Sequence, residues 1–239
     1  MRFTAIHGAF ALCTLAIATL PTLAQAEFAG GRVGVSHSLL TSDTDYAKSS
    51  IDGQVQWNFG SRFLMQTDLG YSGLHALDEN ALTMTNHLGM TFNDGSAAGI
   101  FYGWDRIEGS EDFWGAEYAR SIGAAQMDAY IAVVDEPGSN GTMAGIAARM
   151  PVADAVGMGI SVDHISSNGV ADATRFGIGA DYMLGNATML KGEIGRVSAD
   201  DSAASIDETY LKLGVDFKFG PNGGATFGSR SLLSALPGL

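Results

Sequence analysis

His164 and Ser166 are the residues whose types and spacing point most directly to covalent chemistry. They belong to the segment His164-Ile-Ser166-Ser-Asn168. Residues two apart on a β-strand share a face, so the imidazole would lie within reach of the Ser166 hydroxyl and would serve as a general base for acyl transfer. The nearest acid, Asp172, falls in a predicted loop, so no group orients the histidine. We therefore favour a strand-end histidine at an interface, with catalysis as the alternative.

This segment is similar to the His-x-Ser-Asn segment of outer-membrane phospholipases and lipid A deacylases, whose catalytic pair also faces lipid. The resemblance extends only from His164 to Gly169. Those families place an asparagine or an acid twelve residues after the serine, where this chain has Ile178. The resemblance implies a lipid esterase or deacylase that lacks its orienting group.

A second set of candidates consists of charged residues that alternate with apolar ones along the predicted strands. The set comprises Asp68, Asp105, Glu117 and Asp128 on early and middle strands, then Arg149, Arg175, Lys191, Lys212 and Lys218 on later strands with Asp163, Asp181, Glu193 and Asp216 among them, and Arg32 on the first strand. If the sheet closes, an acidic wall faces a partly basic wall, and the transverse field orients polar solutes that pass between them. The alternative is that these charges pair and close the lumen.

The strand that best defines how these residues are held is the last long one, from Thr209 to Phe219. One set of alternate positions runs from Thr209 through Leu211 and Leu213 to Phe219 and is mostly apolar, whereas the other set is mostly polar. Such alternation predicts a strand with one apolar and one wet face, and about 9–11 residues suffice for a tilted strand to cross a hydrocarbon layer. No helical pattern elsewhere would cover the apolar face. We infer that lipid covers it and that the polar face lines a lumen.

The rest of the chain repeats this pattern in pairs of strands. The first strand, from Phe28 to Leu39, is predicted to put Ala29, Gly31, Val33 and Val35 outside and Phe28, Gly30, Arg32 and Gly34 inside. Tight turns such as Asp94-Gly95 alternate with longer acidic loops near residues 43, 79, 112, 136 and 201. The fold class predicted is an all-β, transmembrane, antiparallel up-and-down β-barrel of about 12 strands with the long loops outside.

The N-terminus predicts export. Arg2, an apolar run from Ala9 to Leu20 and the small-residue site Ala24-Gln25-Ala26 form the pattern of a cleaved secretory signal over residues 1–26. Cys13, the one cysteine, lies within this segment, so the mature chain can form no disulfide. The formal net charge of −13 argues against nucleic acid as a partner. No residues have metal-ligand spacing, and neither a metal nor another cofactor is predicted.

The signal, the paired strands and the terminal aromatic Phe219 resemble a Gram-negative outer-membrane β-barrel of the porin-like family. The resemblance covers residues 27–219 and implies a location in the cell outer membrane, contact with outer-membrane lipid and passive diffusion of small hydrophilic solutes. The acidic loops at the mouth predict a weak cation preference. A structural or adhesion barrel with a closed lumen and a lipid esterase are the alternatives, and a homo-oligomer is compatible with each. Such barrels usually end on the aromatic residue of the last strand, but here residues 220–239 follow. They would form a periplasmic extension, a plug or a further strand.

Overall fold

The computed structural model describes residues 26–107, 109–136, 139–167, 171–201 and 205–237. Almost all of the predicted signal peptide lies outside these residues. Within them, no helix is long and apolar enough to cross a membrane.

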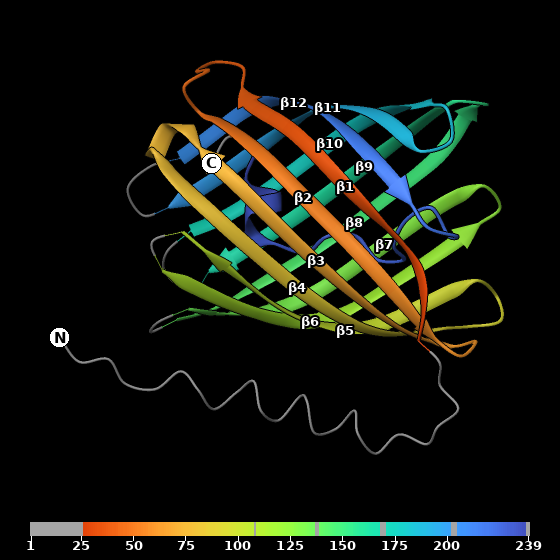
Figure 1. Cartoon of the computed structure of the whole chain (residues 1–239). Coiled ribbons are helices and arrows are strands. Elements are labelled where there is room, and N and C mark those ends of the chain that lie inside the picture. Colours follow the sequence, from red (N-terminus) through yellow and green to blue (C-terminus); the bar gives the residue numbers. More distant parts are fainter. Residues whose placement is uncertain (1–25, 108, 137–138, 168–170, 202–204, 238–239) are drawn as a thin grey trace.

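The described chain forms one closed, antiparallel barrel (Figure 1). Its strands are β1 (Ala26–Leu40), β2 (Ala47–Phe59), β3 (Phe63–Leu74), β4 (Glu79–Thr91), β5 (Ser96–Arg106), β6 (Ser110–Ile122), β7 (Ala125–Glu136), β8 (Ser139–Ala153), β9 (Val156–Ser167), β10 (Ala171–Leu184), β11 (Thr188–Asp201) and β12 (Ser205–Phe219). Each strand pairs with its neighbour in sequence, and β1 pairs with β12 from Gly31 opposite Phe219 to Leu40 opposite Tyr210. The predicted up-and-down barrel is confirmed.

The pleat sorts side chains by polarity as the alternation predicted. Outward residues include Leu213, which is 59% exposed, and Ile131, which is 63% exposed. The inward carboxylates of Asp68, Glu117 and Asp216 are buried. The barrel therefore turns an apolar surface outward and holds its charged residues inside, the inverse of a soluble protein.

The start of β1 differs from its predicted alternation. The register between β1 and β2 shifts between Phe28 and Gly30, which marks a β-bulge there. A bulge adds one unpaired residue, so positions before it change face relative to those after it. Phe28, predicted to lie inside with Arg32, is 41% exposed and stacks on Phe219 with the ring centroids 6.0 Å apart. The prediction was wrong for Phe28 and also for Ala29, which was predicted outside and is buried. It was correct for Val33 and Val35, which are exposed.

The acidic segments predicted as long loops lie mostly within strands. Glu111 and Asp112 belong to β6, Asp135 to β7, and Asp207 to β12. Each hairpin keeps its ladder of backbone hydrogen bonds through these acidic residues. Where two strands run side by side, the ladder satisfies their backbone N–H and C=O groups. The tight turn at Asp94-Gly95 was predicted correctly, and Gly95 has the positive φ of 79° that favours glycine.

The segment after β12, which we call the tail (residues 220–237), returns into the barrel (Figure 1). None of its residues belongs to a strand, and it ends in the short 3-10 helix η3 (Leu232–Ala235). Phe227, Arg230 and Leu233 are buried. Side chains of β2 to β7 make the polar contacts of the tail, and η3 also packs against inward residues of β8 to β10.

Candidate functional site

Three basic residues on the inner face of β8, β10 and β11 are paired with nearby acids. Arg175 contacts Asp163 at 2.5 Å and Glu193 at 2.6 Å. Arg149 contacts Asp181 at 2.5 Å, and Lys191 contacts Asp216 at 2.7 Å. Asp216 also accepts from Arg32 of β1 at 3.1 Å, across the closing pair of strands. Each acid that the sequence puts among the bases is thus the partner of one of them.

Lys212 and Lys218 form no ion pair among the described residues. Glu193 and Asp52 are charged neighbours of Lys212, but Lys191 and Arg175 lie nearby as well. These two lysines give the inner face of β12 an excess of positive charge.

The acidic wall formed by β3, β5, β6 and β7 is occupied by the tail. Arg230 contacts Glu117 at 3.0 Å and Asp128 at 2.8 Å. Asp105 accepts hydrogen bonds from the Ser231 hydroxyl at 2.8 Å and from the Leu232 backbone N–H at 2.7 Å. Because the tail occupies the acidic wall, the acidic and basic walls do not face each other across open space as the sequence suggested. The sequence pattern gave no indication of where the tail binds.

Arg230 is the charged group that the tail adds to the lumen. Its burial lowers the pKa of the guanidinium, but Asp128 and Glu117 raise that pKa by more, so the net direction is upward. The group is a permanent cation in this position, and its loss would leave two buried carboxylates without a partner.

His87 is a buried residue whose role the sequence did not reveal. Its ring is fully buried, with Nδ1 2.7 Å from Glu117 and Nε2 3.3 Å from Asp68. The same ring stacks on Phe227 of the tail, with centroids 6.0 Å apart and planes at 15°. Its inward position on β4 was predicted, but the partners are distant in sequence and no local signal points to them.

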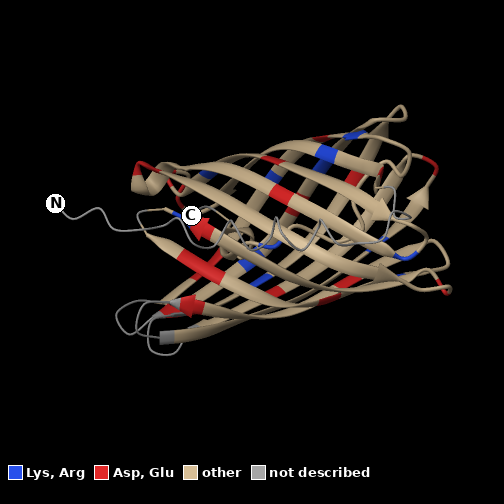
Figure 2. Cartoon of the chain, turned by 60° about the horizontal axis from the view of Figure 1, so that its bottom comes forward, with Lys and Arg blue, Asp and Glu red and all other residues tan. Residues whose placement is uncertain are grey.

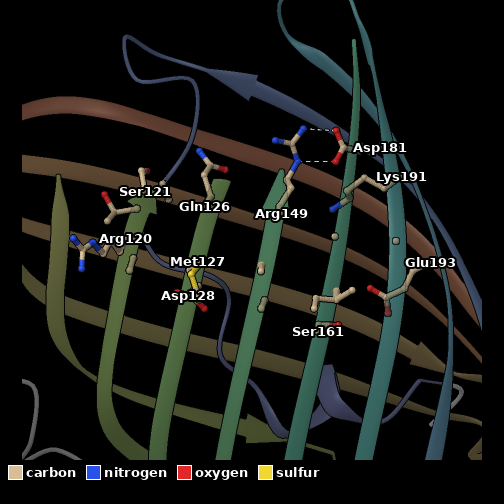
Figure 3. Close-up of a pocket in the computed structure, with 18 of the residues that line it drawn as sticks. Arg120, Ser121, Gln126, Met127, Asp128, Arg149, Ser161, Asp181, Lys191 and Glu193 are labelled. Carbon is tan, nitrogen blue, oxygen red and sulfur yellow. Dashed lines mark hydrogen bonds and ion pairs between the residues drawn. The ribbon is translucent and has the colours of Figure 1, made fainter. Parts of the chain in front are cut away.

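A polar cavity of about 620 Å³ occupies the half of the lumen nearest the tight turns, which we call the turn side (Figure 3). Arg149, Asp181, Lys191 and Glu193 project into it from the strands that carry the bases, and Thr226 of the tail lies on its wall. A volume of this order accommodates a small solute with its hydration water. The cavity joins several of the residues predicted to line a pore.

The half of the lumen nearest the longer connections, which we call the loop side, holds apolar side chains beside the tail. A buried cluster there joins inward residues of β5 to β10 to η3: Phe101, Phe113, Ala132, Val134, Met143, Ile165, Ala173, Leu232 and Ala235. Their alternate spacing was a readable signal for inward positions, since the same parity that places Asp105 inside also places Phe101 inside. The sequence analysis did not recognise that they would meet the tail.

The acidic residues also mark the loop-side rim. Figure 2 shows carboxylate residues on the strand ends beside the connections drawn in grey. Asp43, Asp45 and Asp78 lie exposed in two other connections. Within the described residues, no group of three or more His, Cys, Asp or Glu side chains is arranged to hold a metal ion.

The catalytic alternative for His164 and Ser166 has no support in the hydrogen bonds of the described residues, and the favoured interpretation was a strand-end histidine. His164 is exposed on the outer face, and its Nδ1 lies 2.9 Å from Thr174 Oγ1 of the neighbouring strand. None of the hydrogen bonds found among the described residues joins His164 to Ser166. We expect Ser166→Ala to leave any hydrolysis of ester lipids by the purified protein unchanged, which release of fatty acid from phospholipid micelles would measure. A loss of hydrolysis in this variant would restore the esterase interpretation.

His37 and His75 lie close to each other on the outer face, near the loop-side rim, with Ser49 between them. Ser49 Oγ lies 3.0 Å from His37 Nδ1 and 3.0 Å from His75 Nε2. The sequence analysis treated these histidines as scattered, because cross-strand register rather than spacing brings them together.

Comparison with known proteins identifies the family. A family model described as Gram-negative porin matches residues 22–202. The chain belongs to this family. The predicted resemblance and the location in the outer membrane are thereby confirmed.

Solved structures share the fold at low sequence identity. The NanC porin superposes with a TM-score of 0.62 at 8% identity over 78% of this chain and 100% of that chain. The KdgM porin has a TM-score of 0.56 at 10% identity over 79% and 99% of the two chains. The COG4313 outer membrane channel from Pseudomonas putida F1 has a TM-score of 0.57 at 14% identity over 84% and 99%. No curated protein matches the chain significantly.

Proposed function

We propose that the protein is an outer-membrane channel for passive diffusion of small hydrophilic solutes, narrowed by its own tail. The observation that carries this proposal is the polar cavity of about 620 Å³ inside a closed barrel of the porin family. Arg149, Asp181, Lys191 and Glu193 give its wall charges of both signs, which suits polar, hydrated solutes. Asp128 and Lys212 also line this cavity. The proposed lining further includes Asp163, Arg175, Asp216, Arg32 and Lys218. Asp68, Asp105 and Glu117 are buried in this structure.

A weak cation preference is part of this proposal. The rim acids Asp43, Asp45 and Asp78 are exposed, whereas most interior carboxylates have a basic partner and contribute little net field. Carboxylates at a channel mouth raise the local cation concentration. The preference is modest, because solvent screens the rim acids and Lys212 on the cavity wall, which has no ion-pair partner among the described residues, acts against it.

Electrical recording in planar bilayers tests the proposal. The purified protein is expected to give discrete current steps, and in a gradient of KCl the reversal potential should have the sign of a weak cation preference. The triple variant Asp43→Asn, Asp45→Asn, Asp78→Asn should move that potential towards zero when the dilute side is about 0.01 M, where the screening length is about 30 Å. Asp154→Asn, at the opposite end of the barrel, is the matched control. An absence of current steps in all recordings would remove the channel proposal.

A structural barrel with a closed lumen is the second candidate. It is supported by the apolar cluster on the loop side, where Leu232 and Ala235 pack among inward residues of β5 to β10. The same recordings separate the two candidates, because a closed barrel passes no current. We further propose that outer-membrane lipid covers the exposed apolar belt. Chemical cross-linking of the protein in membranes would reveal a homo-oligomer.

A further inference from the structure

The inner wall of β2 to β5 contacts the backbone of the tail in a regular way. Gln66 donates to the Phe227 carbonyl oxygen and accepts from the Phe227 N–H, both at 3.0 Å. Gln56 accepts from the Thr226 N–H at 2.7 Å, and Thr85 donates to the Arg230 carbonyl oxygen at 2.7 Å. Bonds to backbone atoms recognise an extended chain independently of its side chains.

This recognition continues to the end of the tail. Asp105 accepts from the Leu232 N–H, and Lys48 donates to the carbonyl oxygens of Leu233 and Leu236. The side chains that make these contacts come from separate strands, and each would require water if the tail were absent.

Two buried positions of the tail supply side-chain specificity. Phe227 is 2% exposed and stacks on His87, and a Cβ at Gly89 would come within 2.7 Å of its ring, so the glycine makes room for it. Three residues later, Arg230 is 4% exposed, pairs with Glu117 and Asp128, and lies 4.4 Å from the centre of the Tyr130 ring. The pockets therefore fit an aromatic residue followed at the third position by a cation.

We propose that the inner wall of β2 to β7 is a binding site for a cationic peptide that binds as an irregular segment ending in a 3-10 turn, and that residues 226–236 occupy it in cis. The ligand class is a peptide with the pattern Phe-x-x-Arg followed by small and apolar residues. The tail is tethered to β12 through Gly220 to Gly224, so it competes at an effective concentration of about 1 mM. A peptide in trans therefore binds only when the cis segment is weakened. Binding itself does not depend on the proposed channel function.

The test uses the full chain with Phe227→Ser and Arg230→Ser, which removes both side-chain anchors of the cis segment. A fluorescein-labelled peptide of residues 222–237 is titrated in detergent and followed by fluorescence anisotropy. We expect saturable binding to this double variant, and binding at least about tenfold weaker to the unsubstituted chain. A peptide with serine at both anchor positions should not bind.

A variant of the wall completes the test. Adding Glu117→Gln to the double variant should weaken peptide binding about tenfold, the range for a buried hydrogen bond to a charged group, whereas Asp207→Asn on the outer surface should have no effect. The proposal is overturned if both peptides bind equally, if the unsubstituted chain binds as well as the double variant, or if the folded double variant binds neither. Heat-modifiable gel mobility checks folding, and Arg230→Ser alone replaces the double variant if that chain does not fold.

Current recordings separate this proposal from the channel. If the double variant conducts, the unsubstituted peptide should block the current. If the peptide binds but no variant conducts, the channel function fails and the peptide site stands.

Discussion

Substitution of Arg230 by glutamate is expected to release the tail and raise the single-channel conductance several-fold. Arg230 is 4% exposed between Glu117 and Asp128. Removal of one partner from a buried ion pair costs about 3–5 kcal/mol, which is roughly a hundredfold to several thousandfold in an equilibrium between bound and released tail. A glutamate adds repulsion to that cost. The measurement is single-channel conductance in a planar bilayer, together with cleavage of the tail by a protease added to the folded protein.

A suitable control is Arg196→Glu. Arg196 pairs with Asp207, but both side chains are exposed on the outer face, 66% and 53% respectively. Exposed ion pairs contribute little, so this variant should keep the parental conductance and the protease resistance of the tail. A conductance that stays the same in Arg230→Glu, with the tail still protected, would mean that the arginine does not hold the tail in the lumen.

Substitution of Ile131 by arginine is expected to destabilise the barrel in lipid by about 2–4 kcal/mol, the cost of arginine on the lipid face near the bilayer midplane. Ile131 is 63% exposed and lies midway along β7. This cost corresponds to roughly a thirtyfold to thousandfold smaller folding equilibrium constant. Urea titration of the protein folded into phospholipid vesicles measures it.

Ser36→Arg provides the comparison inside the lumen. Ser36 lines the polar cavity, where a new guanidinium keeps its hydration, so this variant should fold almost as stably as the parent. Equal loss of stability in the two variants would indicate that the outer face of β7 does not contact lipid.

The alternation of polar and apolar residues was sufficient to predict the barrel, because on a strand parity alone decides which face a side chain occupies. Leu213 and Ile131 were assigned outward and Asp68 and Glu117 inward on this basis. Phe28 was assigned to the wrong face because a bulge reverses parity without a clear mark in the sequence. The alternation therefore predicts which face a side chain occupies along a regular stretch of strand, but not from one side of a bulge to the other.

The contents of the lumen were harder to predict than its wall. The stack of His87 on Phe227 joins residues far apart in the chain, and the tail has no periodic pattern that would indicate its partners. A local motif also raised a catalytic alternative for His164 and Ser166, but cross-strand register gave His164 the neighbour Thr174. Cross-strand register and the path of an irregular segment are tertiary properties, and neither is encoded in local spacing.

The path of the tail also bears on how the molecule resists mechanical opening. After β12 the chain crosses the junction with β1, where the Asn222 N–H donates to the Ala29 carbonyl oxygen, and it then contacts β2, β3, β4 and β5 in turn. The tail therefore reinforces the junction between the first and last strands from inside the barrel. Lateral separation of those strands would have to break the hydrogen bonds of the tail as well as those of the β1–β12 ladder. We therefore expect the strands of the intact chain to separate slowly.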